Sequence, residues 1–329
     1  MTKKNLFLLT GCAVLLAGVA AWVSHDKRPR SAQLNGAPLM ANMDLSRVTA
    51  IEIGSKLKLE AQSDGWKITS HAGYPADKSK IVANLLKLKE QTVGQVVRGR
   101  ATAGTLVPVR LKESDTTVAE VQLGDVHMKK IAGMPDAFGG YPDGRYAELN
   151  GQIVLLKDPL SAFDSQPANW CETKIISIPA NLILKAEYTQ GGNTVCLERS
   201  TNGVWTVEGL KADEELNPGQ TYALDGALAN LNLVSLANPS LSDAETGFDQ
   251  GYIYKVTVKD GDQTFTHTAR IGKQVPDETA YYFRLDDRPW LYMIPQYAAE
   301  SLMKTRDDLV RQKEKQAKPA SEEETAQSS

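Results

Sequence analysis

The chain contains an internal duplication, and this feature constrains its fold more than any other. The passages "VTAIEIGSKLKLEAQSDGWKI", from Val48, and "ANLILKAEYTQGGNTVCLERSTNGVWTV", from Ala180, both alternate apolar and polar residues in short runs that lead to a tryptophan. Asp-Gly, Gly-Gly and Asn-Gly pairs separate the runs, and such pairs are typical of β-hairpin turns because they tolerate positive φ. The same order of elements occurring twice predicts two tandem copies of one folding unit.

A helix is predicted after the tryptophan strand in each copy. It begins after Asp77 in the first copy, a residue type that caps helix N-termini, and after Asn217-Pro218 in the second. Apolar side chains recur along both segments at the spacing of one helix face: Ile81, Leu85 and Leu88 in the first copy, and Leu224, Leu228 and Leu231 in the second. We expect this face to pack against the sheet.

Four further strands are predicted in each copy, at 107–113, 118–125, 144–150 and 152–158, and at 253–260, 265–273, 280–287 and 289–295. Leu123-Gly124 aligns with Ile271-Gly272, and residues 146–149 align with 282–285. The predicted fold class is therefore α+β, with two tandem repeats of an antiparallel meander sheet and one main helix in each. Trp66 and Trp205 are predicted to be core residues, with sugar stacking as the alternative.

The amino-terminal segment is predicted to cross a membrane. From Leu6 to Val23 no side chain is charged, and a helix of this length matches the thickness of a bilayer core. The predicted transmembrane signal anchor covers residues 1–24 and includes the apolar and interfacial side chains Leu6, Leu9, Leu15, Leu16, Val19 and Trp22. A lipoprotein attached through Cys12 is the alternative, although the apolar run before Cys12 is short and continues after it.

The remaining boundaries follow from composition. Residues 25–42 mix Pro, Gly, Ala and Asn without an apolar period and are predicted to be a linker. The first repeat is placed at 43–178 and the second at 179–310, followed by a disordered tail at 311–329 that has almost no apolar residues. A short basic tail before one span and a large domain after it predict a single-pass protein of the bacterial inner membrane with its bulk in the periplasm.

Charge and cysteine usage exclude several classes of function. The 329 residues carry a formal net charge of −3, and Lys and Arg are scattered among Asp and Glu, so we expect no nucleic-acid partner. Three cysteines are too few for a disulfide scaffold. Cys171 and Cys196 could form one disulfide or remain two separate thiols.

The sequence lacks the motifs of the common enzyme classes. No P-loop, serine-hydrolase, zinc-protease or thioredoxin motif occurs, so we predict no catalytic, cofactor-binding or metal-ligating residue and no cofactor. The segment "GMPDAFGGYPDG" is instead a candidate interaction loop. Its Met134, Phe138 and Tyr141 are apolar groups on a Gly- and Pro-rich segment that does not favour regular structure. Packing of this loop onto its own domain is the alternative.

The residues quoted above resemble a known bacterial family. The paired strands with "GWKI" or "GVWTV", the capped helix "PADKSKIVANLLKLKEQ" and the strands "YAEL" and "YFRL" are similar to the domain of unknown function DUF4340, over nearly all of residues 43–310. The resemblance implies an extracytoplasmic accessory protein of gliding-type ABC transport systems, with no established catalytic residues.

Two functional hypotheses of different classes remain. The first is a membrane-anchored, non-enzymatic accessory or scaffold protein that binds a protein partner, such as the permease or ATPase of a transport or surface-assembly complex. The second is an anchored cell-envelope hydrolase that uses carboxylates between the repeats, because such groups need only meet in space. The sequence does not identify a small-molecule ligand.

Overall fold

The computed structural model describes residues 34–40, 43–131, 133, 140–217, 219, 220, 226 and 228–313. The chain divides into two compact units, Met1–Cys171 and Glu172–Ser329. The predicted membrane anchor, with Leu6, Leu9, Leu15, Leu16, Val19 and Trp22, lies outside the described residues. Among the helices that are described, none combines the length and the apolar character needed to cross a membrane.

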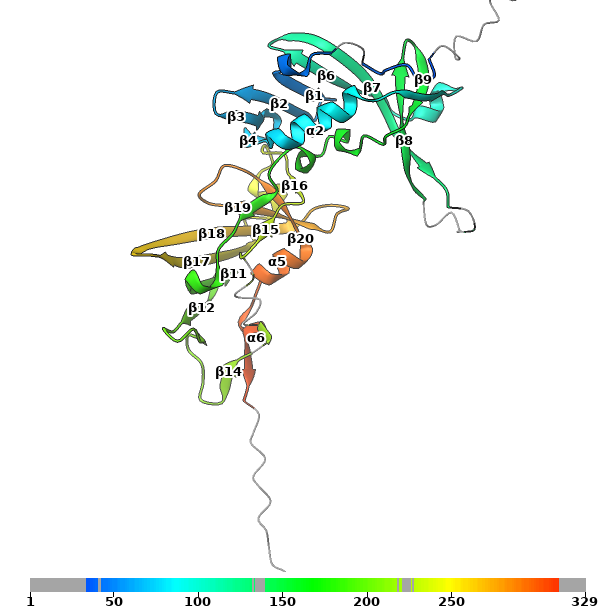
Figure 1. Cartoon of the computed structure of the whole chain (residues 1–329). Coiled ribbons are helices and arrows are strands. Elements are labelled where there is room, and N and C mark those ends of the chain that lie inside the picture. Colours follow the sequence, from blue (N-terminus) through cyan, green and yellow to red (C-terminus); the bar gives the residue numbers. More distant parts are fainter. Residues whose placement is uncertain are drawn as a thin grey trace, which may run out of the picture. The chain divides into compact units, whose positions relative to one another are not determined.

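The first unit is built on a nine-stranded antiparallel sheet with the order β4-β3-β2-β1-β6-β7-β8-β9-β5 (Figure 1). The strands are β1 Ala50–Ile53, β2 Leu57–Gln62, β3 Gly65–Ile68, β4 Tyr74–Pro75, β5 Val93–Val96, β6 Val107–Glu113, β7 Thr116–Lys129, β8 Tyr141–Leu149 and β9 Gln152–Leu156. Short 3-10 turns lie at Leu45–Arg47, Thr69–His71, Arg100–Ala103, Ser161–Phe163 and Pro167–Asn169.

One helix, α2 (Lys78–Lys89), packs on this sheet (Figure 1). It begins after Asp77, whose side chain accepts hydrogen bonds from the backbone amides of Ser79 and Lys80 at 2.8 and 3.3 Å. Ile81, Leu85 and Leu88 are buried, at the spacing of one helix face.

The second unit contains an eight-stranded antiparallel sheet with the order β13-β12-β11-β17-β18-β19-β20-β16. Its strands are β11 Ile183–Gln190, β12 Asn193–Arg199, β13 Trp205–Val207, β16 Ser235–Leu236, β17 Tyr252–Asp260, β18 Gln263–Gln274, β19 Ala280–Leu285 and β20 Tyr292–Pro295. Two small sheets accompany it, formed by β10 Lys174–Ile176 with β15 Leu231–Asn232 and by β14 Glu214–Leu216 with β21 Val310–Gln312. The helices are α4 Asp243–Thr246, α5 Gln296–Leu302 and α6 Arg306–Leu309, and a 3-10 turn lies at Ala180–Leu182.

The two sheets have the same topology. The order β3-β2-β1-β6-β7-β8-β9-β5 corresponds strand for strand to β13-β12-β11-β17-β18-β19-β20-β16, and β4 is an addition at one edge of the first sheet. The register agrees as well, because Leu123 pairs with Ala147 in the first sheet and Ile271 pairs with Phe283 in the second. The predicted tandem duplication and the antiparallel meander are therefore confirmed.

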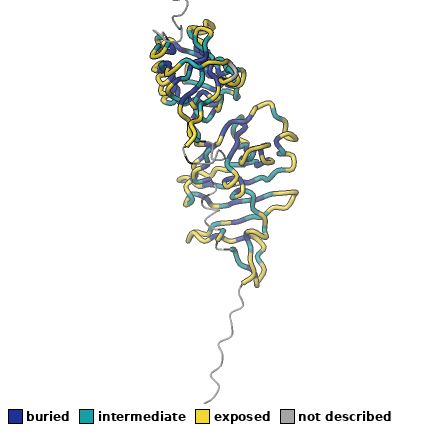
Figure 2. The backbone as a smooth tube through the Cα atoms, turned by 90° about the vertical axis from the view of Figure 1, so that its right-hand side faces the viewer, coloured by how far each residue is buried: buried dark blue, intermediate teal, exposed yellow. Residues whose placement is uncertain are grey.

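Burial alternates along the strands of the second sheet (Figure 2). In β17, Tyr254, Val256 and Val258 are buried while the residues between them are more exposed, as expected for a strand with one face toward a core. A further cluster of buried side chains lies on the opposite face of β19 and its neighbours; it comprises Ala237, Phe248, Val275, Ala280, Tyr282, Leu291 and Met293.

Several segments differ from their predicted roles at the edges of the repeats. The last part of the predicted linker, residues 34–40, lies along the folded unit, and its Leu39 and Met40 are buried because they are apolar. The segment that contains β10 belongs to the second unit, since β10 pairs with β15. At the other end the fold continues past Val310 into β21, whereas the tail was predicted to begin at residue 311.

The predicted helix of the second repeat needs a correction at its end. Leu231 lies in β15 instead of on a helix, because its backbone pairs with that of Ile176. Most of the preceding segment, including Leu224, lies outside the described residues. Leu228 and Leu231 are nevertheless both buried, so their apolar character is used in the core although the helical spacing does not hold.

Candidate functional site

The outer ends of β7 and β8 form a two-stranded ribbon that extends beyond the first sheet (Figure 1). The last pair between β6 and β7 is Val107 with Leu123, and the last pair between β8 and β9 is Arg145 with Leu156. Beyond these pairs, the described residues of β7 and β8 pair only with each other: Val126 with Arg145, Met128 with Pro142 and Lys129 with Tyr141. We call residues 126–131 and 141–144 the β7–β8 ribbon.

The β7–β8 ribbon exposes apolar side chains. Tyr141 and Met128 are each 45% exposed and Ile131 is 41% exposed. Tyr141 belongs to the predicted interaction loop and lies in β8, opposite Lys129. The other two residues of that prediction, Met134 and Phe138, lie outside the described residues. The sequence did not indicate Met128 and Ile131, because they precede the Gly- and Pro-rich segment on which the prediction of an interaction loop rests.

Polar contacts along the ribbon fix its strands to each other. The Nζ atom of Lys129 lies 3.6 Å from Oδ2 of Asp143 across the strand pair. The negative charge of Asp143, followed by the contribution of Tyr141, raises the pKa of Lys129 above its ordinary value. Nearer the sheet, Nδ1 of His127 lies 2.9 Å from the hydroxyl of Tyr146, and the two rings meet edge to face.

A buried arginine holds the base of the ribbon. Arg145 donates hydrogen bonds to the carbonyl oxygens of Gly124 at 2.9 Å and Leu160 at 3.0 Å, and its Nη1 lies 2.7 Å from Oδ1 of Asp164. These contacts join β8 to the neighbouring strand and to the segment after β9, so the ribbon projects from a firmly anchored base. The sequence did indicate that Arg145 faces inward, because it lies two residues before the inward-facing Ala147 in the same strand.

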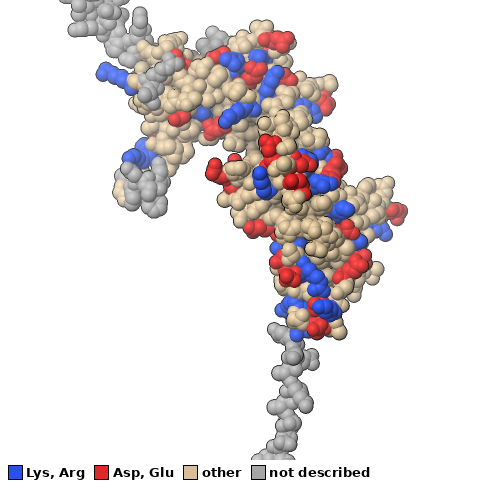
Figure 3. Space-filling view, turned by 180° about the vertical axis from the view of Figure 1, so that it is seen from behind, with Lys and Arg blue, Asp and Glu red and all other residues tan. Residues whose placement is uncertain are grey.

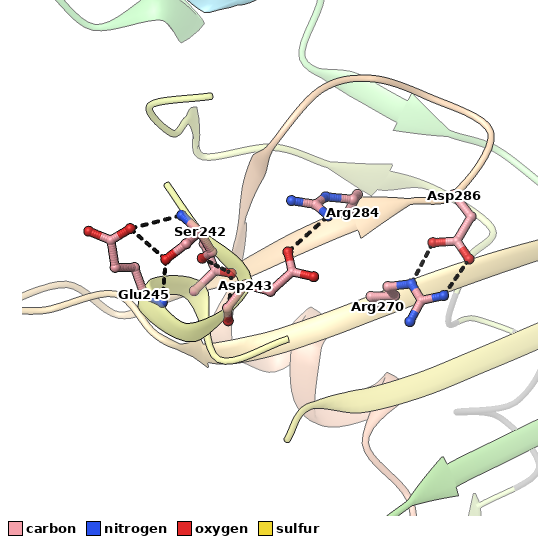
Figure 4. A network of polar contacts seen from close by, with 7 residues as sticks. Ser242, Asp243, Glu245, Arg270, Arg284 and Asp286 are labelled. Atoms are coloured by element: carbon pink, nitrogen blue, oxygen red, sulfur yellow. Dashed lines mark hydrogen bonds and ion pairs between the residues drawn. The ribbon is translucent and has the colours of Figure 1, made fainter. Parts of the chain in front are cut away.

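The second unit contains a network of paired charges (Figure 4). Its Arg284 is two residues from Tyr282 in β19 and so lies on the same face of the strand. Arg270 and Arg284 lie opposite each other in β18 and β19. Arg270 donates two hydrogen bonds to the carboxylate of Asp286, at 2.7 and 2.9 Å. Arg284 bonds Asp243 at 3.2 Å, and its guanidinium lies 4.7 Å from the ring centre of Phe248. Two like charges are thereby accommodated in neighbouring positions.

The same network caps the short helix α4. The hydroxyl of Ser242 accepts a hydrogen bond from the amide of Glu245, and the carboxylate of Glu245 accepts one from the amide of Ser242 at 2.8 Å. These bonds from Ser242 lower the pKa of Glu245. The ion pair between Asp243 and Arg284 joins α4 to the sheet.

The displaced pKa values among the carboxyl groups of the described residues all move in one direction. A general acid needs a pKa raised toward the working pH, usually by burial. The carboxyl groups with a clearly displaced pKa are all displaced downward by hydrogen-bond donors: Asp44, Asp64, Glu214, Glu245 and Asp308. No cluster of three metal-ligating side chains occurs in the described ranges.

A hollow of about 730 Å³ in the second unit gathers three carboxylates. Asp277, Glu278 and Glu300 line it together with Val234 and Tyr297. All three of these residues are exposed to solvent. Over the face of the molecule seen in Figure 3, acidic and basic side chains are interspersed.

The two tryptophans predicted as core residues differ in burial. Trp205 is 5% exposed, and the guanidinium of Arg199, its cross-strand neighbour, lies 5.6 Å from its ring centre. Trp66 occupies the equivalent place in β3, opposite Ala61, but is only partly buried. The predicted core role therefore fits Trp205 better than Trp66.

Cys171 and Cys196 are not joined by a disulfide. Cys171 is buried at the end of the first unit, and Cys196 lies in β12 of the second. Burial is the main cause that raises the pKa of the Cys196 thiol, so the reactive thiolate is disfavoured. The sequence left open either a disulfide between Cys171 and Cys196 or two separate thiols, and the structure has two separate thiols.

Comparison with known proteins gives one match. The sequence matches the family described as Domain of unknown function (DUF4340) in two segments, residues 66–251 and 244–326, which together cover more than half of the chain. No curated protein and no solved structure matches it.

Proposed function

The chain belongs to the DUF4340 family of domains of unknown function, and from this premise we propose that it is a non-enzymatic, membrane-anchored protein of the bacterial periplasm. Its task is to bind a protein partner through the β7–β8 ribbon. The partner that fits the anchoring and the family resemblance is a subunit of a transport or surface-assembly complex of the ABC type.

The exposed apolar side chains of the ribbon carry the proposal. Met128 and Tyr141 lie on the paired strands β7 and β8, and Ile131 follows β7 by two residues; each of the three is more than 40% exposed. Aromatic residues and methionine are enriched in protein interfaces, and exposed strand edges offer unpaired backbone groups to an incoming strand. A projection of this kind, held at its base by Arg145, is suited to contact another protein.

The anchoring part rests on the sequence. Residues 6–23 are uncharged and long enough to span a bilayer as a helix, and charged residues flank them on both sides. A reporter enzyme that is active only outside the cytoplasm, fused to the carboxyl end, tests the compartment. Activity of the fusion in the membrane fraction is expected, and activity in the soluble fraction alone would contradict the anchor.

The binding part is tested by co-purification of the full chain from membranes. A photo-crosslinking residue at Tyr141 is expected to capture one defined membrane protein, identified by mass spectrometry. Met128→Ser with Tyr141→Ser should reduce the yield of that complex at least tenfold. Phe265→Ser is the matched control, because Phe265 is 46% exposed on a hairpin of the second repeat. Equal loss in both variants, or in neither, would reject the ribbon as the binding surface.

A further inference from the structure

The outward face of α2 carries two exposed apolar side chains with lysines around them. While Ile81, Leu85 and Leu88 face the sheet, Val82 is 47% exposed and Leu86 is 43% exposed. These two residues are four positions apart and therefore lie above each other on one face of the helix. Both side chains remain exposed in the part of the first unit that the structure describes.

Lysines flank this pair. Lys78, Lys87 and Lys89 are exposed, and helical spacing places Lys78 and Lys89 on one side of Val82 and Leu86 and Lys87 on the other. Lys80 is different, because its Nζ atom donates hydrogen bonds to the carbonyl oxygens of Ala168 and Cys171. Two acidic residues lie near this face: Glu90, at the end of the helix, and Asp44, whose carboxylate interacts electrostatically with Lys89.

The amino-terminal segment joins the folded unit beside the end of α2. The amide of Gly36 donates to the carbonyl of Val93 at 2.8 Å, and the amide of Leu39 donates to the carbonyl of Gln91 at 2.8 Å. Residues 34–40 thus run along the segment that directly follows α2. Residues 24–33 separate this attachment from the apolar run, and even a fully extended chain of that length reaches only ~35 Å.

We propose that the outward face of α2 lies on the lipid surface of the membrane in which residues 6–23 are anchored, with Val82 and Leu86 entering the interface and the three lysines facing anionic headgroups. A helix with apolar residues between lysines is the kind that rests in a membrane interface. This inference rests on the anchoring part of the proposed function. It is independent of the β7–β8 ribbon.

Because residues 24–33 tether the folded unit to the membrane, the small outward face of α2 is sufficient for contact with lipid. Two apolar side chains and three lysines would bind a vesicle only weakly from free solution. When the chain is already held within ~35 Å of the bilayer, the second contact is intramolecular and its effective concentration is high. Each lysine near an anionic surface strengthens such a contact about fivefold, and salt weakens it by screening.

The test uses the full chain in lipid nanodiscs. An environment-sensitive fluorophore is attached at Val82→Cys, with Cys12 and Cys196 replaced by serine and Cys171 left in place because it is fully buried. The control carries the fluorophore at Val118→Cys, a 42% exposed site on β7 of the same unit. Nanodiscs contain either phosphatidylcholine alone or phosphatidylcholine with phosphatidylglycerol.

We expect blue-shifted emission from position 82 in the phosphatidylglycerol nanodiscs only, quenched by a lipid-borne quencher, and no shift from position 118. Replacing Lys78, Lys87 and Lys89 by glutamine should weaken the contact about a hundredfold, and added salt should reverse the shift. Circular dichroism and a melting curve show that each variant is folded.

Three results would overturn the proposal. Incorporation into nanodiscs with water-like emission at position 82 would leave the anchor standing and reject the contact of α2 with lipid. A blue shift that appears in detergent as the protein concentration rises would assign the face to a second copy of the chain. Failure to incorporate at all would reject the anchor, and with it the basis for this inference.

Discussion

The carbonyl oxygen of Ala103 occupies the space that a Cβ atom on Gly124 would need. The second repeat contains the same arrangement, with the carbonyl of Thr246 against Gly272. In both repeats the carbonyl ends a short helix, and a glycine in a strand lets that helix approach the sheet. The equivalence supports a common origin of the two units at a level of detail beyond strand order.

Replacing either strand glycine by alanine should loosen its own unit. The added methyl group must displace backbone atoms, so Gly124→Ala and Gly272→Ala should each lower the free energy of unfolding by about 1–3 kcal/mol. Hydrogen exchange followed by mass spectrometry should show faster exchange in the first unit for Gly124→Ala and in the second for Gly272→Ala. Gly226→Ala is the control, because an added Cβ there meets nothing within 4 Å. Equal exchange in all three variants would rule out the close approach.

The buried guanidinium of Arg145 should contribute more to stability than any exposed ion pair. Arg145→Met leaves the carbonyls of Gly124 and Leu160 without their donor, so we expect a loss of about 2–3 kcal/mol in urea unfolding. Arg110→Met is the control, since Arg110 and its partner Glu120 have side chains 38% and 39% exposed, and its loss should stay below about 1 kcal/mol. Similar losses would mean that Arg145 does not secure the base of the ribbon.

The two equivalent tryptophans should respond unequally to truncation. Trp205 is enclosed by the core and by Arg199, so Trp205→Ala should destabilise the chain by about 3–5 kcal/mol. Trp66 is only partly buried, so Trp66→Ala should lower the free energy of unfolding by less than half as much as Trp205→Ala. Urea denaturation monitored by circular dichroism measures both. A larger loss at Trp66 would show that its partly buried ring makes contacts whose contribution burial does not reveal.

The sequence predicted the duplication well because the signals that define it are local. Turn dipeptides and alternating residues are read directly from the chain, and the correspondence of Leu123-Gly124 with Ile271-Gly272 follows from them. The short helices that press on these glycines were not predicted. A helix of four residues gives no periodic pattern, and its position is decided by the sheet on which it packs.

Other features depended on how the strands pair. Ala61 lies across from the partly buried Trp66, and Arg199 lies across from the buried Trp205, a difference that is known only once the register is known. Leu231 has the right spacing for a helix, yet pairing with Ile176 places it in a strand. The candidate interaction surface was predicted in part, through Tyr141. Met128 and Ile131 belong to it because the β7–β8 ribbon extends beyond the sheet, and the sequence does not give the length of that ribbon.

The carboxylate of Glu214 should make the stability of the second unit depend on pH in the acid range. Glu214 is buried and accepts hydrogen bonds from Arg306 at 2.6 and 3.2 Å and from the amide of Lys211 at 3.0 Å. Arg306 is the main cause that lowers its pKa from an ordinary 4.5 to about 2. The interaction joins β14 to α6, and so holds the carboxyl-terminal strand in place.

The direction of this pH dependence follows from proton binding at Glu214 in the folded and the unfolded chain. Between pH 4.5 and about 2 the unfolded chain binds a proton at Glu214 that the folded chain does not, so stability is complete above this range and decreases as the pH falls through it. Glu214→Gln should remove this dependence, so that the difference in unfolding free energy from the parent chain narrows toward pH 2. Asp260→Asn, at the exposed end of β17, serves as the control in urea titrations across the range. A difference between parent and Glu214→Gln that stays constant from pH 6 to about 2 would contradict the ion pair.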